Sequence, residues 1–163
     1  MAKGEFALGR ESFENALSLE MDPAKWGSAA LLQDLYAMLT DVAVLERNLQ
    51  VLLKYAPLAE EIATRYDHRL YLGIAWRARG VAHRLLGEHA QAEARLNQAL
   101  DTFREVGANW QLGRTWFELG ELALARSQRE QAHACYSQAR LAFANLGAVL
   151  DETQASAALA TIL

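Results

Sequence analysis

Apolar residues recur at helical spacing along most of the chain. Between residues 89 and 106, Ala92, Leu96, Ala99, Leu100 and Phe103 follow one another at i, i+4, i+7, i+8 and i+11, which places them on one stripe of a helix. The preceding stretch, 71–86, reads as a second helix and is followed by a glycine suited to a left-handed helix end. No stretch alternates β-branched or aromatic residues with polar ones in the manner of a strand. The pattern predicts an all-α chain.

This helical pair repeats after 40 residues. Aligning residues 72–111 with residues 112–151 gives twelve identities, among them Trp76 with Trp116, Gly80 with Gly120 and Phe103 with Phe143. Ala-rich helices aligned by chance would match alanines, but they would not also match tryptophan, phenylalanine and three glycines in one register. The sequence therefore predicts antiparallel helical hairpins that stack side by side, each covering the apolar flank of its neighbour.

A weaker copy precedes these two repeats. Tyr36 aligns with Trp76, and helices are expected at about 28–44 and 47–65, with Pro57 either bending the second helix or interrupting it. A single helix, ended by Asp22 and Pro23, is expected before that copy, so the chain begins halfway through a repeat. The predicted organisation is one domain, 1–163, made of a lone helix (4–21), a degenerate repeat (26–66), two repeats (70–107 and 110–147) and a capping helix (151–163).

Glycine inside the predicted helix around Gly120 needs an explanation, because interior glycine destabilises a helix by about 1 kcal/mol relative to alanine. The second helix of the same repeat carries the small residues Ala132 and Ala139 on its apolar stripe. We therefore expect Gly120 to allow the close approach of two helices. Ser127 takes the place of the glycine between the helices of this repeat, so that turn has to form without one.

Composition and charge exclude several classes of function. The chain has 163 residues and a net charge of −4, with ten Asp and Glu against six Lys and Arg in residues 1–66 and ten of each in residues 67–163. Without a basic excess, neither nucleic acid nor an anionic membrane is expected as a partner. No apolar run approaches the roughly 20 residues that span a bilayer. One cysteine, no signal-peptide pattern and no internal disulfide predict a cytoplasmic protein.

Candidate catalytic chemistry is sparse. The four histidines form no HExxH pair, and none lies four residues from another histidine or from Cys135. Cys135 has no basic neighbour in sequence and is interpreted as a small hydrophobic residue. No glycine-rich phosphate loop is present, and the adjacent Glu60 and Glu61 point apart on a helix. We expect no enzyme activity, no cofactor and no metal site.

The repeat carries a recognisable signature. Trp116-x-x-Leu119-Gly120, followed by Ala132-x-x-x-Tyr136 and Ala139, resembles the tetratricopeptide repeat, and the preceding copy resembles it less closely. The period of 40 residues and the missing closing proline depart from the family pattern of about 34 residues. With these departures, the repeat resembles the longer-helix variety of tetratricopeptide repeat found in bacterial signal-transduction ATPases and maltose-regulon-type transcription activators. The resemblance implies an α-α superhelix, a tetratricopeptide-like solenoid.

The resemblance also implies a function and a set of positions for it. It implies a non-catalytic module for protein–protein interaction or scaffolding, an arm of a larger bacterial signalling or regulatory protein that binds a peptide in its concave groove. Family geometry, carried over from the tryptophan and glycine positions, assigns to that groove Asp34, Asp41, Arg77, Val81, Arg84, Arg114, Phe117 and Glu121.

Two interpretations of the groove arginines stay open at the level of sequence. Arg77, Arg84 and Arg114 form a basic strip that suits the carboxylates or phosphates of an acidic peptide, with an apolar contact from Phe117. Alternatively, the three arginines pair with Asp34, Asp41 and Glu121 across neighbouring helices and bind no partner. Two further functions are alternatives to a passive scaffold: a switch that senses a ligand or peptide, and self-association as a homodimer.

Overall fold

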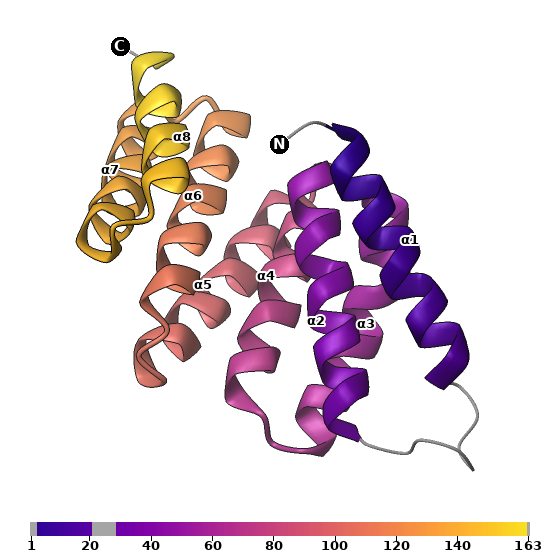
Figure 1. Ribbon diagram of the computed structural model, residues 1–163. Helices are drawn as coiled ribbons and strands as arrows, with labels where there is room; N and C mark the ends of the chain where they lie inside the picture. The colour runs from indigo at the N-terminus through magenta and orange to yellow at the C-terminus, as the bar shows by residue number, and fades with distance from the viewer. Residues whose placement is uncertain (1–2, 21–28, 163) are drawn as a thin grey trace.

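The computed structural model describes residues 3–20 and 29–162, and all secondary structure in these ranges is helical (Figure 1). The helices are α1 (Lys3–Glu20), α2 (Ala29–Glu46), α3 (Leu49–Arg65), α4 (Arg69–Leu85), α5 (His89–Glu105), α6 (Asn109–Ala125), α7 (Arg129–Leu146) and α8 (Val149–Ala160). The predicted all-α fold of antiparallel hairpins is confirmed. The helix end expected at Asp22 and Pro23, the repeat start at 26 and the final residue 163 lie outside the described residues.

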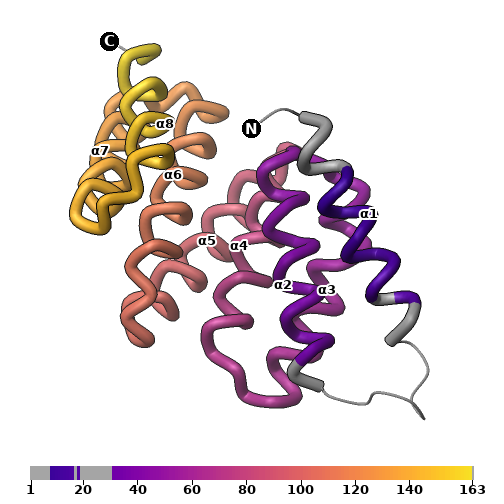
Figure 2. Tube along the Cα trace, viewed as in Figure 1, coloured from indigo at the N-terminus to yellow at the C-terminus, as the bar shows by residue number. Residues whose placement is uncertain are grey.

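The helices form two layers. Three hairpins, α2–α3, α4–α5 and α6–α7, stack so that α2, α4 and α6 lie in one row and α3, α5 and α7 in the other, while α1 packs on α2 and α8 on α7 (Figures 1 and 2). The ion pair of Asp41 with Arg114 connects α2 directly to α6, two hairpins further along the chain. The row of α2, α4 and α6 is therefore the inner side of a curved stack. Helix α3 continues through Pro57, so this proline does not interrupt it.

Each turn from α2 onward contains one residue in the left-handed backbone conformation. Three of these residues are glycines, and Ser127 takes the same conformation, with φ of 61°, in the turn between α6 and α7. There the N–H of Gln128 donates to the carbonyl of Ala123 at 2.9 Å, just as Glu88 donates to His83 at 2.9 Å in the turn before α5. The turn thus keeps its geometry without glycine, although the left-handed conformation costs an L residue about 1 kcal/mol.

Interior glycines allow the two helices of a hairpin to pack closely. A Cβ on Gly120 would lie 2.6 Å from Cε1 of Tyr136, and a Cβ on Gly80 would lie 2.7 Å from Cγ of Leu96. The expected close approach is confirmed, but the group that meets Gly120 is the ring of Tyr136 rather than the neighbouring small residues. The Tyr136 side chain is 0% exposed, and its ring packs directly against the backbone of Gly120.

Candidate binding groove

Seven charged side chains meet on the inner side of the stack. They come from α2, the turn after it, α4 and α6, and we call them the inner charge cluster: Asp41, Arg47, Arg77, Arg84, Arg114, Glu118 and Glu121. Helical spacing brings residues of one helix to this side, since Arg77 and Arg84 are seven residues apart on α4.

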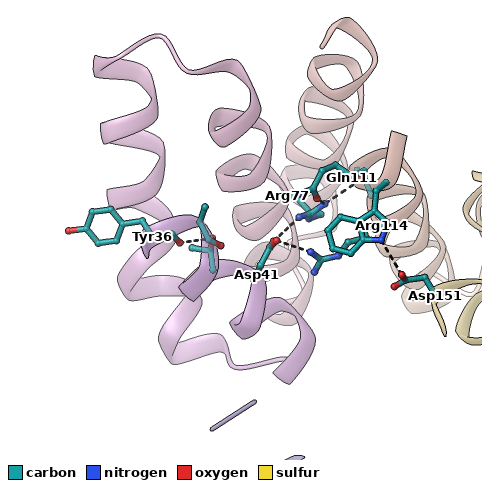
Figure 3. Close-up of polar contacts among 10 residues, drawn as sticks. Tyr36, Asp41, Arg77, Gln111, Arg114 and Asp151 are labelled. Carbon is teal, nitrogen blue, oxygen red and sulfur yellow. Dashed lines mark hydrogen bonds and ion pairs between the residues drawn. The ribbon is translucent and has the colours of Figure 1, made fainter. Parts of the chain in front are cut away.

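Asp41 is the first centre of the cluster. Arg77 donates from Nη2 to Oδ1 at 2.7 Å, and Arg114 donates from Nη1 to Oδ2 at 2.8 Å (Figure 3). Arg77 also donates to the side-chain oxygen of Gln111. One carboxylate of α2 therefore binds α4 and α6 at once, which fixes the distance between the first and third hairpins.

Glu118 and Glu121 are the second centre. Glu118 accepts from Arg47 Nη1 at 2.5 Å and from Arg84 Nη2 at 3.0 Å. Glu121 accepts from Arg47 Nη2 at 3.1 Å and from the hydroxyl of Tyr136 at 2.6 Å. Arg47 occupies the turn after α2, so its two contacts join residues 71 and 74 positions apart in the chain.

The environment of Asp41 and Arg77 lowers the pKa of both groups. Burial raises the pKa of Asp41, but the guanidinium groups of Arg77 and Arg114 together lower it by more than burial raises it. The pKa of Asp41 therefore lies below its ordinary value. Burial, together with repulsion from Arg114, lowers the pKa of Arg77 to about 10 despite the attraction of Asp41. The rings of Phe103 and Trp110 lie 5.4 and 4.8 Å from the guanidinium carbons of Arg77 and Arg114. Asp41 and Arg77 are therefore both ionised at neutral pH.

These shifts predict how stability depends on pH. The pKa of Glu60 on α3 is also below its ordinary value: burial raises it, and hydrogen bonds from Arg79 and Trp76 lower it more. A carboxyl whose pKa is lowered by folding stabilises the fold above its unfolded pKa, 3.8 for Asp41 and 4.5 for Glu60, and loses that contribution as pH falls through the folded value. We expect the free energy of unfolding, measured in urea, to be level from pH 7 to about pH 5 and to decrease steadily below about pH 4.5. A level profile down to pH 3 would contradict these carboxylate assignments.

The structure places the predicted groove residues in different environments. Arg77, Arg84 and Arg114 are each paired with a carboxylate, as the internal-pairing interpretation requires for Asp41 and Glu121. Val81 is 0% exposed and packs in the core between α2, α3 and α4.

The two remaining predicted residues, Phe117 and Asp34, have other contacts. Phe117 packs on Tyr136 with ring centroids 5.1 Å apart. Asp34 accepts a hydrogen bond from the hydroxyl of Tyr71 rather than from an arginine.

Sequence reasoning missed Arg47 and Glu118. Arg47 adopts a positive φ of 55° in a turn, where arginine gives no pattern to recognise, and Glu118 is 5% exposed on the inner side of α6. The usable signal for Glu118 was its position four residues after Arg114, on the same face of a helix.

Two hollows lie on the inner side of the stack. The larger, which we call the α1–α2–α4 pocket, has a volume of about 380 Å³; its apolar lining is Phe13, Ala37, Met38, Val42 and Ile74, and its polar lining is Asp34, Asp41 and Tyr71. The smaller, between α2, α6 and α8, measures about 110 Å³ and includes Leu45, Arg114 and Phe117. In the described ranges no group of three or more His, Cys, Asp and Glu side chains is placed to hold a metal ion, and no helix there is long and apolar enough to cross a membrane.

Comparison with known proteins identifies the repeat. Residues 71–144 match the family model of the tetratricopeptide repeat. The crystal structure of BtubC (BKLC) from P. vanneervenii is similar to this chain, with a TM-score of 0.64 and 17% sequence identity, over 98% of this chain and 72% of that one. At this identity the similarity concerns the fold alone. No curated protein sequence matches the chain significantly.

Proposed function

Because the chain contains a tetratricopeptide repeat domain, we propose that its inner side binds a segment of a partner protein and performs no catalysis. Tetratricopeptide repeats generally mediate protein–protein interaction or scaffolding. The observation that carries the proposal is the α1–α2–α4 pocket, a hollow of about 380 Å³ on the inner side whose lining is largely apolar. This volume lies within the range of about 300–1,000 Å³ that is typical of ligand pockets.

The proposed contact residues are those that the groove leaves exposed. Met38 of α2 lines the larger pocket and is 48% exposed. Leu45, seven residues later in the same helix, lines the smaller pocket and is 47% exposed. The predicted groove arginines contribute to this surface indirectly, because their ion pairs hold α2, α4 and α6 together. Their direct contact with an acidic partner stays a prediction.

We place this binding domain in a larger bacterial signalling or regulatory protein, in the cytoplasm. The resemblance of its long repeats to those of signal-transduction ATPases supports the larger signalling protein. The single cysteine and the acidic composition support the cytoplasmic location.

Selection of peptides from a random displayed library against the full chain tests the proposal. We expect the enriched peptides to lose affinity at least about tenfold, equivalent to 1.4 kcal/mol, when Met38→Arg or Leu45→Arg places a charge in the groove. Leu53→Arg is the matched control, because Leu53 is 52% exposed and belongs to α3 in the outer row. Fluorescence anisotropy of the labelled peptides measures the affinities. Peptides that bind both groove variants as tightly as the parent chain would place the binding surface elsewhere.

A further inference from the structure

We propose, building on the function above, that the α1–α2–α4 pocket receives an apolar side chain of the partner segment while Asp34 binds a lysine or arginine next to it. The partner segment is then basic and apolar rather than acidic. The argument has three parts: the free acceptor capacity of Asp34, the apolar lining around it, and the pairing of every arginine that faces this side.

Asp34 carries a negative charge that no cation in the described part of the chain neutralises. Its carboxylate accepts a hydrogen bond from the hydroxyl of Tyr71, which is a neutral group. Asp41, seven residues later in α2, is instead neutralised by two arginines. An ionised carboxylate has acceptor sites for about four hydrogen bonds, so most of those of Asp34 are available to a partner. Hydrogen bonds from a lysine or arginine to such a carboxylate are about twice as strong as neutral ones.

The pocket next to Asp34 suits an apolar side chain. Phe13 of α1, Val42 of α2 and Ile74 of α4 form walls on three sides, and Met38 stands half exposed at the opening. Methionine is flexible and adapts its shape to different apolar groups. Burial of an aliphatic side chain here removes apolar surface from water on both partners.

Electrostatics favour a basic segment over an acidic one. Helices α1 and α2, which form two walls of the pocket, carry seven Asp and Glu against two Lys and Arg. Arg77 and Arg84 of α4 do not line the pocket, and both are paired: Arg77 with Asp41, and Arg84 with Glu118. An incoming cation therefore meets an uncompensated carboxylate, whereas no arginine is among the described residues that line the pocket to receive an incoming anion.

Three labelled peptides test the inference with the full chain. They are a basic and apolar peptide, GSGLKLKLGSG, its acidic counterpart, GSGLELELGSG, and a basic peptide without apolar residues, GSGSKSKSGSG. We expect the first to bind at least about tenfold more tightly than the other two, and to weaken as salt is added because its attraction to Asp34 is screened. Fluorescence anisotropy at 50 and 300 mM salt measures the dissociation constants.

Two variants separate Asp34 from net charge. Asp34→Asn keeps the shape and an acceptor for Tyr71 but removes the charge, and it is expected to weaken the basic and apolar peptide about tenfold. Glu130→Gln removes one charge from the exposed first turn of α7 and is expected to leave binding unchanged. Equal effects of the two variants, or no difference among the peptides, would overturn the inference.

The outcomes also distinguish this inference from the function on which it rests. Preferential binding of the acidic peptide, weakened by Met38→Arg, would overturn the role of Asp34 and leave the groove as the binding surface. Failure of all three peptides overturns the inference. The proposed function fails with it only if the library-selected peptides are also insensitive to Met38→Arg and Leu45→Arg.

Discussion

Replacement of Gly120 by leucine is expected to destabilise the folded chain by about 3 kcal/mol or more, because the helix pair α6–α7 has no room for a side chain at this position. Even a single Cβ there would lie 2.6 and 2.7 Å from Cε1 and Cδ1 of the Tyr136 ring. That ring cannot move away easily, since Tyr136 is 0% exposed and its hydroxyl is bound to Glu121. Leucine adds three further carbons to the same contact, so the two helices have to separate.

Alanine at the same position shows whether contact or backbone preference decides. Without the contact, Gly→Ala inside a helix is stabilising by roughly 0.5–1 kcal/mol. Gly9→Ala is the matched control, because Gly9 lies within α1 and its added Cβ meets no atom within 4 Å. We expect Gly9→Ala to raise the urea midpoint or leave it unchanged, and Gly120→Ala to lower it.

A double-mutant cycle assigns the effect to one contact. When Tyr136→Ala removes the ring, the added Gly120→Ala is expected to cause no further loss, so the two effects do not add. Circular dichroism during urea unfolding measures all the variants. An unchanged unfolding midpoint for Gly120→Leu would mean that α6 and α7 are not packed as closely as the structure shows.

The repeated pattern explains how much of this fold was accessible from sequence. Trp76 and Trp116 align at 40 residues, and both lie half buried on the first helix of a hairpin. Periodicity and register are local properties, so they predicted the helices and their pairing. The same alignment did not predict the group opposite Gly120, because that depends on which side chain of α7 fills a gap between two helices.

Corresponding positions of two repeats do not keep the same chemistry. Trp76 donates to Glu60, which also binds Arg79 and Arg95. The residues 40 positions later are Leu100, Leu119 and Cys135, and Trp116 packs against apolar neighbours there. The stack therefore tolerates either an ion cluster or an apolar contact beside the tryptophan. The 40-residue repeat does not predict which of the two contacts a given tryptophan makes.

The candidate site was less predictable for a related reason. Its positions on the inner side followed from helix geometry, but the partner of each charge depends on curvature, which sums small rotations over several hairpins. The contact of Arg47 with Glu118 spans 71 residues and exists only because α2 approaches α6. The α1–α2–α4 pocket has walls from three helices, so no single stretch of sequence contains its pattern.

Removal of the Asp41 carboxylate is the second change expected to have a large effect. Asp41→Ala leaves the guanidinium groups of Arg77 and Arg114, whose side chains are 0% and 9% exposed, without their carboxylate. Breaking a buried ion pair by deleting one partner destabilises a protein by about 3–5 kcal/mol, and we expect about 3 kcal/mol here because one side of Asp41 faces a pocket. Urea unfolding at pH 7 measures the loss.

The matched control is Asp101→Ala on α5. Asp101 pairs with Arg104 at 2.9 Å, but the two side chains are 68% and 52% exposed, so we expect a loss of less than about 1 kcal/mol. Both replacements change aspartate to alanine within a helix, so their difference reports burial of the partners rather than helix preference. Equal losses would show that the inner charge cluster is solvated and does not hold α2, α4 and α6 together.

A variant without charge then separates stability from geometry. Buried ion clusters replaced by apolar residues of similar size are often neutral or stabilising. We expect Asp41→Leu combined with Arg77→Met and Arg114→Met to recover most of the stability that Asp41→Ala loses. The apolar replacements lack the directional hydrogen bonds from α4 and α6 to one carboxylate, so we expect the angle between hairpins to change in the triple variant. Small-angle X-ray scattering in solution measures this change. Recovery of stability with an unchanged scattering profile would mean that packing alone sets the curvature, and the charge cluster would then have no structural role in shaping the groove.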